Sequence, residues 1–125
     1  MKQSHVLQLA CEPLPIVRIG FIGLGNRGMA TLRRYLVIDG VEIVALCDIH
    51  RAHLDEASAV IAADGKYTPC LLNAQDGWKQ MCQRDDIDLI YICTDWLTHA
   101  PMACYAMEQG KHVAIEVPAA TTVEE

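Results

Sequence analysis

Three glycines spaced Gly-x-Gly-x-x-Gly are the residues of this sequence best suited to hold a reactive cofactor. Gly23, Gly25 and Gly28 lie between an apolar run and a segment with helical periodicity. In such a loop the first glycine permits a tight turn, the second lets the backbone approach a pyrophosphate, and the third lets the helix pack closely on the strand. The amides at the helix N-terminus then face the anion. The pattern predicts a dinucleotide site; the alternative is a turn that merely needs flexible residues.

An acidic residue, Asp48, follows the next apolar run. It stands roughly 20 residues after the third glycine, where dinucleotide-binding domains carry the residue that contacts the adenosine ribose. A carboxylate there accepts hydrogen bonds from ribose hydroxyls and repels a 2′-phosphate, so the sequence favours NAD over NADP. His50 and Arg51 lie close enough to weaken that repulsion. The alternative for Asp48 is an N-cap of the following helix.

Charged side chains stand at two other loops of the predicted site. Arg27, next to Asn26 in the glycine loop, pairs with a phosphate or is a solvated surface charge. Glu116 follows the last apolar run, where it contacts the nicotinamide ribose or is simply an exposed carboxylate at a strand end. The residue types leave both alternatives open.

The segment 94–99 follows another apolar run and borders the same predicted cleft. Trp96 is a candidate wall for a cofactor ring, and the alternative is a tryptophan packed under a loop. His99 is a candidate proton carrier, and the alternative is a structural histidine at a helix start. We find no Ser/His/Asp arrangement, phosphate-binding P-loop or metal-ligand motif in the sequence.

Apolar runs alternate with helical patterns along the chain, which predicts the elements that position these residues. Nearly continuous apolar strands that alternate with helices are typical of a doubly wound parallel α/β sheet, which is the Rossmann NAD(P)-binding fold. We expect an irregular lead-in over 1–15 and one dinucleotide-binding domain over 16–125. The predicted strands are 16–22, 41–47, 88–93 and 111–115, with a weaker one near Tyr67, and the predicted helices are 26–38, 51–63, 77–84 and 98–109.

Helical periodicity also predicts which side chains face the core. The expected inward residues are Met29, Leu32, Leu36 and Val37 in the first helix, Leu54, Ala57, Val60 and Ile61 in the second, and Trp78, Met81 and Cys82 in the third.

Composition limits the class of protein. The chain has 125 residues, of which 52% are hydrophobic, enough for the core of one domain. Its net charge of −6 argues against nucleic acid or an anionic membrane as the main partner. No run is long enough to span a bilayer and no signal peptide is evident, so a cytoplasmic protein is expected. The 6 cysteines include no Cys-x-x-Cys pair and are expected to be free thiols.

Four segments together resemble a known superfamily. Residues 19–28, 45–48 and 91–99 look like the glucose–fructose oxidoreductase and inositol dehydrogenase superfamily. Residues 111–120, which contain Glu-Val-Pro-Ala-Ala, are similar to one branch, the family-109 glycoside hydrolases, which are NAD-dependent α-N-acetylgalactosaminidases. The resemblance runs from about Val17 to Glu125.

The resemblance implies a set of NAD contacts and a redox-assisted hydrolysis. In that branch NAD stays bound: the sugar is oxidised at C3, which acidifies the C2 proton, and elimination then expels the glycosidic oxygen from C1. Water adds, C3 is reduced again, and no pair of catalytic carboxylates is needed. The implied contacts are Asn26, Arg27, Asp48, Trp96, Leu97, Thr98, His99, Glu116 and Val117.

Two departures qualify the resemblance. Most dehydrogenases of the superfamily have Glu-Lys-Pro, with a lysine that helps the redox chemistry, where this chain has Glu116, Val117 and Pro118. Family members are several hundred residues long, and their tyrosine and histidine acid–base groups and substrate-binding sheet lie beyond the position of Glu125. We therefore expect a truncated product or isolated N-terminal domain with a cofactor site, no catalytic residue of its own, and a sugar site only where a downstream domain is present.

Two alternatives remain from the sequence. One is a dehydrogenase domain for a sugar or polyol, which the missing lysine disfavours. The other is a non-enzymatic nucleotide-binding module whose exposed apolar surface favours self-association.

Overall fold

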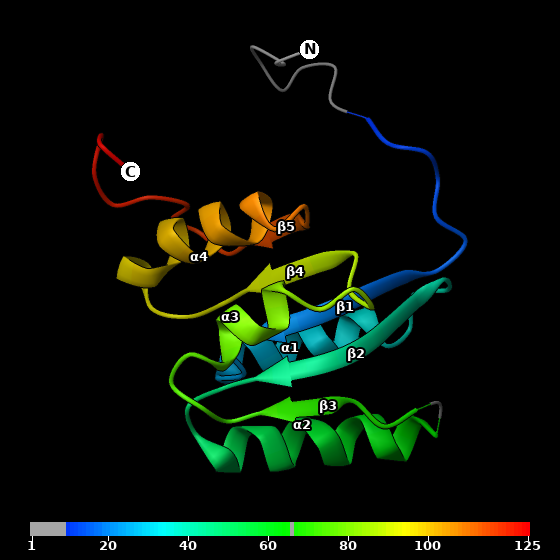
Figure 1. Ribbon diagram of the computed structural model, residues 1–125. Helices are drawn as coiled ribbons and strands as arrows, with labels where there is room; N and C mark the ends of the chain where they lie inside the picture. The colour runs from blue at the N-terminus through cyan, green and yellow to red at the C-terminus, as the bar shows by residue number, and fades with distance from the viewer. Residues whose placement is uncertain (1–9, 66) are drawn as a thin grey trace.

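A parallel sheet of five strands is the centre of the computed structural model, which describes residues 10–65 and 67–125. The strands lie in the order β3-β2-β1-β4-β5, and every neighbouring pair is parallel. Figure 1 shows this sheet with its helices, and the doubly wound α/β prediction is confirmed. In chain order the elements are β1 (Val17–Ile22), α1 (Asn26–Tyr35), β2 (Val41–Cys47), α2 (Arg51–Asp64), β3 (Cys70–Leu72), α3 (Gly77–Cys82), β4 (Leu89–Ile92), α4 (Trp96–Glu108) and β5 (His112–Ile115).

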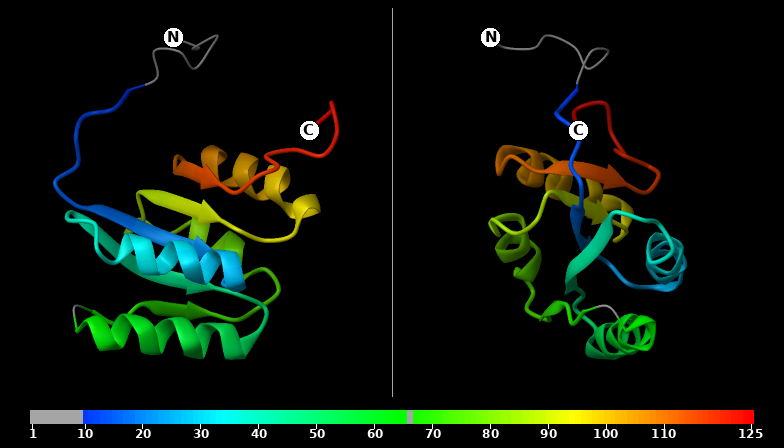
Figure 2. Two further views of the ribbon diagram at one scale, coloured as in Figure 1. Left: turned by 180° about the vertical axis from the view of Figure 1, so that it is seen from behind. Right: turned by 90° about the vertical axis from the view of Figure 1, so that its right-hand side faces the viewer.

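Helices cover both faces of the sheet, as the end-on view of Figure 2 shows. Ile19 and Phe21 of β1 pack with α1 and α2, whereas Ile22 packs with α3 and α4. Side chains alternate between the two faces of a strand, so β1 serves both cores at once. This double burial explains why the strands read as continuous apolar runs.

A register shift in β2 sets the direction of its carboxyl end. The pairing of β1 with β2 is irregular between Ile19 and Gly20, where β2 advances from Ile43 to Ala45. Beyond this bulge Leu46 packs on the α1–α2 face and Cys47 on the α3–α4 face. The residue after Cys47 is therefore directed to the α1–α2 side, where its carboxylate meets the glycine loop and α2.

The first helix is shorter than its sequence pattern indicates. The prediction over 26–38 is wrong at its end, because α1 stops at Tyr35 and Leu36 is its C-cap. Leu36 is buried as expected, but Val37 is 81% exposed, so its inward orientation is a wrong prediction. Three turn residues then lead to Gly40, whose φ of 78° lies in the left-handed region that favours glycine.

Two other elements differ from their predicted positions. The weak strand expected near Tyr67 is instead β3, at Cys70–Leu72, which pairs with β2. The fourth helix begins at Trp96 rather than Thr98, because the Asp95 carboxylate accepts the Leu97 N–H at 3.0 Å and caps the helix. The remaining predicted helices and strands are found with ends that differ by two residues or fewer.

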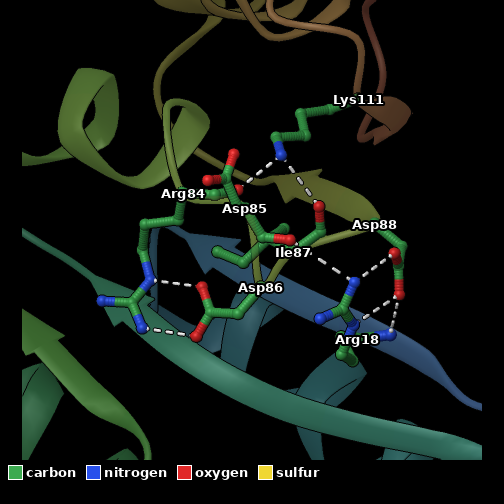
Figure 3. Close-up of polar contacts among 7 residues, drawn as sticks. All are labelled: Arg18, Arg84, Asp85, Asp86, Ile87, Asp88 and Lys111. Atoms are coloured by element: carbon green, nitrogen blue, oxygen red, sulfur yellow. Dashed lines mark hydrogen bonds and ion pairs between the residues drawn. The ribbon is translucent and has the colours of Figure 1, made fainter.

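Polar contacts tie the strands together at their amino ends, opposite the predicted cleft. Arg18 donates to both carboxylate oxygens of Asp88, with its Nη2 2.8 Å from Oδ1, and its backbone N–H donates to Oδ2 at 2.9 Å. Lys111 donates from Nζ to the carbonyls of Arg84 and Ile87. Figure 3 shows how these contacts link β1, the α3–β4 turn and the start of β5. These contacts stabilise the amino ends of the strands, where no predicted site residue lies.

Within the described ranges, no helix combines the length and apolar character needed to cross a membrane.

Candidate functional site

A pocket of about 390 Å³ opens at the carboxyl ends of β1, β2 and β4. Its walls include Gly23 and Gly25 of the glycine loop, Asp48 after β2, Trp78 of α3 and Thr98 of α4. The chain leaves β1 for one face of the sheet and β4 for the other, so the pocket lies at the topological switch point. Doubly wound folds bind ligands in the crevice at that point.

The three glycines of the loop are required for different reasons. A Cβ on Gly23 would stand 2.1 Å from the carbonyl oxygen of Cys93, and its φ is 92°. A Cβ on Gly28 would stand 2.2 Å from the carbonyl oxygen of Gly23. A Cβ on Gly25 would meet nothing within 4 Å, although Gly25 lines the pocket. The protein's own packing explains Gly23 and Gly28, whereas the space beside Gly25 is open, as a backbone approached by a ligand requires.

The amino end of α1 is free to bind an anion. Its N-cap is Gly25, which has no side chain to accept from the first amides, and its first turn holds no acidic residue. By contrast, Asp95 caps α4 and already occupies the N–H of Leu97. Unpaired amides and the helix dipole attract negative charge. The geometry at α1 therefore fits a phosphate group, and the residues present fit a dinucleotide.

The Asp48 carboxylate joins the glycine loop to the start of α2. Its Oδ2 accepts the Leu24 N–H at 2.8 Å and a hydrogen bond from His53 Nδ1 at 3.0 Å. Its Oδ1 accepts the His50 N–H at 2.8 Å. Asn73 donates to the Asp48 carbonyl oxygen at 3.0 Å and braces the same turn. The N-cap of α2 is His50 without a side-chain capping bond, so Asp48 is not the N-cap that sequence reasoning left open.

Arg27 and Glu116, which are far apart in the sequence, form an ion pair. Arg27 Nε lies 3.0 Å from Glu116 Oε1, and the same oxygen accepts the Tyr91 hydroxyl at 2.8 Å. The Tyr91 hydroxyl also contacts Thr31 of α1, whose Oγ1 lies 3.1 Å from the Tyr91 oxygen. The hydrogen bond from Tyr91, and then the bond and charge of Arg27, lower the pKa of Glu116, whereas burial raises the pKa of Tyr91. Arg27 is thus paired rather than simply solvated, Glu116 is not an isolated strand-end carboxylate, and a contact of Arg27 with a phosphate stays a prediction.

His99 is buried, and both of its ring nitrogens lie next to backbone carbonyl oxygens. It is 1% exposed, and its Nδ1 and Nε2 lie 2.8 Å from the Pro118 carbonyl oxygen and 3.1 Å from the Thr94 carbonyl oxygen. The ring therefore links the loop after β4 to the loop after β5. This arrangement favours the structural alternative over a proton carrier, and a direct contact with NAD stays a prediction.

Three predicted contacts with apolar side chains face solvent. Trp96, Leu97 and Val117 are 65%, 73% and 81% exposed. The alternative of a Trp96 packed under a loop is therefore wrong. It is Trp78, not Trp96, that forms a wall of the pocket, with its ring 5.3 Å from that of Tyr105.

The structure brings only part of the predicted site to one pocket. Gly23, Gly25, Asp48 and Thr98 line it. The residues outside its walls are Asn26, Arg27, Gly28, Trp96, Leu97, His99, Glu116 and Val117.

Sequence reasoning missed several residues that build the site. Trp78, on the helix after β3, lines the pocket, whereas His53 of α2 and Asn73 of the loop after β3 bond to Asp48. Their one available signal was position, since loops after parallel strands gather at one edge of the sheet. Because the third strand was predicted only weakly and at the wrong position, the residues that follow it could not be assigned to the site.

The fold and the pocket together define a class, the dinucleotide-binding Rossmann domains. Residues 17–125 match the model of the oxidoreductase family with an NAD-binding Rossmann fold, and the chain belongs to that family. NAD is accordingly the cofactor of this fold, as predicted from Asp48 and the glycine loop.

Within this family, the chain is highly similar to proteins of one branch. The chain is 63% identical over 123 residues to an alpha-N-acetylgalactosaminidase of Bacteroides fragilis, covering 98% of this chain and 29% of that protein. It is 48% identical over 123 residues to a glycosyl hydrolase family 109 protein of Phocaeicola vulgatus, covering 98% of this chain and 30% of the relative. The chain thus spans less than a third of the length of these relatives.

Solved structures show the same fold in dehydrogenases. The myo-inositol dehydrogenase of Lactobacillus casei, in complex with NAD(H) and myo-inositol, superposes with a TM-score of 0.77 at 26% identity. The match covers 87% of this chain and 30% of that one. The resemblance found in the sequence, to the superfamily and to its family-109 branch, is confirmed.

Proposed function

We propose that this chain is the NAD-binding domain of a redox-assisted α-N-acetylgalactosaminidase, with residues 16–125 as one domain. The observation that carries the proposal is the 63% identity to the Bacteroides fragilis enzyme over 98% of this chain. The Val117 position supports it, because the sugar dehydrogenases that the chain resembles carry a lysine there. When bound, NAD supplies a reversible acceptor for a hydride from the sugar.

The proposed roles of the residues follow from their positions. Gly25 leaves room for the pyrophosphate beside the amides of Asn26, Arg27 and Gly28 at the start of α1. Gly23 shapes the turn that presents them.

Asp48 and the residues after β4 and β5 complete the proposed cofactor site. Asp48 accepts a hydroxyl of the adenosine ribose. Thr98, Trp96 and Leu97 lie at the start of α4, where they border the cofactor. Glu116 and Val117, held beside His99 by the Pro118 carbonyl, border its nicotinamide end.

Hydrolysis by this chain alone is not part of the proposal. The matched stretch corresponds to 29% of the Bacteroides fragilis enzyme, and we assign the acid–base groups and the sugar site to the rest of such a protein. This chain supplies cofactor binding, orientation and the apolar walls that exclude water.

A dehydrogenase domain for a sugar or polyol is the second candidate. The 26% identity to an inositol dehydrogenase solved with NAD(H) favours it. The two candidates differ in their products: a dehydrogenase accumulates NADH, whereas a redox-assisted glycosidase returns the hydride to the sugar and accumulates none.

A nucleotide-binding module that self-associates is the third candidate. Trp96, Leu97 and Val117 are exposed apolar side chains near one end of the sheet, and such surface favours association. Light scattering across a concentration series distinguishes it, because a monomer at all concentrations contradicts self-association.

One set of assays tests the first candidate and detects any activity expected of the second. The chain is titrated with NAD by calorimetry and then incubated with NAD and either a chromogenic α-N-acetylgalactosaminide or the free sugar. We expect NAD binding, no chromophore release and no NADH absorbance. Cleavage by the chain alone would contradict the assignment of catalysis to other residues, and NADH formed from the free sugar would favour the dehydrogenase.

A further inference from the structure

Among the described residues, three donors bond to the Asp48 carboxylate, which leaves one of its acceptor positions open. An ionised carboxylate offers about four acceptor positions, two on each oxygen. The Leu24 N–H and His53 Nδ1 occupy both positions of Oδ2, and the His50 N–H occupies one position of Oδ1. The side chain is 7% exposed and lines the pocket. The remaining position, on Oδ1, is therefore available to a ribose hydroxyl.

The three donors to Asp48 lie on two loops and one helix. Leu24 belongs to the glycine loop and His50 to the turn before α2, and both segments border the pocket. His53 lies in the first turn of α2 itself. A carboxylate only accepts, so Nδ1 of His53 carries the hydrogen. The His50 ring contacts the His53 ring edge-on, with centroids 5.0 Å apart.

We propose that His53 is a positioning residue for the cofactor: it anchors Asp48 so that the open position of Oδ1 faces the adenosine ribose. The inference rests on the NAD site proposed above and assigns it a further determinant. Asp48 is anchored to a helix through His53, and a helix holds geometry more tightly than a loop. Without that anchor the carboxylate turns about its broad terminal torsion, and Oδ2 gains a position that water occupies.

The test compares ligands with and without the adenosine 2′-hydroxyl. NAD and its 2′-deoxyadenosine analogue are titrated by calorimetry into the wild-type chain, His53→Ala and His53→Asn. A hydrogen bond to a charged group corresponds to about a 10-fold preference of the wild type for NAD. We expect His53→Ala to lose most of this preference and His53→Asn to regain it, because an asparagine amide N–H can reach Oδ2.

The control is His112→Ala, which removes an exposed histidine at the amino end of β5 and should leave the preference unchanged. An unchanged preference in His53→Ala would overturn the proposal, as would a wild type that binds NAD without the preference. A wild type that binds no NAD would overturn the NAD site itself. Should His53→Ala fail to fold, nitrogen NMR of the wild type decides, since an unprotonated His53 Nδ1 is incompatible with the proposed bond.

Discussion

The guanidinium of Arg27 and the carboxylate of Glu116 are paired at 3.0 Å, which joins the glycine loop to the end of β5. Both residues are proposed NAD contacts, so an arriving phosphate competes with Glu116 for Arg27. The pair is partly exposed, at 62% for Arg27 and 20% for Glu116, and exposed pairs exchange partners at little cost.

Removing the Tyr91 hydroxyl should raise the pKa of Glu116. That hydroxyl donates to Glu116 Oε1 and is the main cause of the lowered pKa, so Tyr91→Phe should move the value towards that of an ordinary glutamate. Carbon NMR of the carboxyl group during a pH titration measures the shift. Tyr105→Phe is the matched control, because the Tyr105 hydroxyl is bonded to Gln83 instead. A Glu116 pKa that does not rise in Tyr91→Phe would contradict the assigned cause.

Alanine at Gly28 should destabilise the fold. Its Cβ would stand 2.2 Å from the Gly23 carbonyl oxygen, so the loop and α1 must separate. Overpacking typically costs about 1–3 kcal/mol, and this contact is with backbone that cannot rotate away. Thermal unfolding should show a lowered midpoint. Gly65→Ala is an informative comparison, because it adds only the strain of a left-handed φ with nothing within 4 Å. An equal loss in both variants would be evidence against a packing role for Gly28.

Acidification should remove the contribution of Asp88 to stability. Hydrogen bonds from Arg18 lower the pKa of Asp88, so the folded state binds this proton less readily than the unfolded state does. The contribution is present above the unfolded-state pKa and is lost as the pH falls through the folded-state pKa. Urea unfolding of the wild type and Asp88→Asn should therefore differ most at neutral pH and converge in acid. Asp76→Asn, an exposed carboxylate without a side-chain capping bond, serves as control. A difference that persists unchanged in acid would refute this linkage.

Alkylation should distinguish the cysteines by burial. Burial raises the pKa of Cys47 to about 12 and that of Cys82 to about 11, so neither provides much thiolate at neutral pH. Cys104 is exposed. Peptide mass spectrometry after brief iodoacetamide treatment should find Cys104 modified and the two buried thiols modified only after unfolding. Rapid modification of Cys47 in the folded chain would show that its side of the sheet is open.

The sequence predicted the sheet because its strands are buried on both faces. β2 was placed at its observed bounds, since an apolar run between two turn signals has few other interpretations. Helix ends were less certain. The apolar Val37 extended the pattern of α1, yet the helix ends before it. At α4 the cap formed by Asp95 fixed a start that hydrophobic periodicity cannot detect.

Some residues of the site could be predicted from local sequence, whereas others depend on contacts between distant segments. The glycine loop and Asp48 were evident because their roles depend on local backbone geometry and on position after a strand. The pairing of Arg27 with Glu116, which are 89 residues apart, depends on how β5 docks beside α1. Trp78 reaches the pocket through a helix of only 6 residues. No residue spacing encodes those contacts.

The titration of NAD into Gly25→Ala and the wild type tests the central claim most directly. A Cβ at Gly25 meets no protein atom within 4 Å and its φ of −68° is ordinary, so the variant should fold, with only the small loss of unfolding temperature that alanine causes at an N-cap. The same Cβ would enter the space proposed for the pyrophosphate, so NAD affinity should fall by about 10-fold or more, which corresponds to about 1.4 kcal/mol. A stable Gly25→Ala protein that binds NAD as tightly as the wild type would contradict the claim that this loop holds the cofactor.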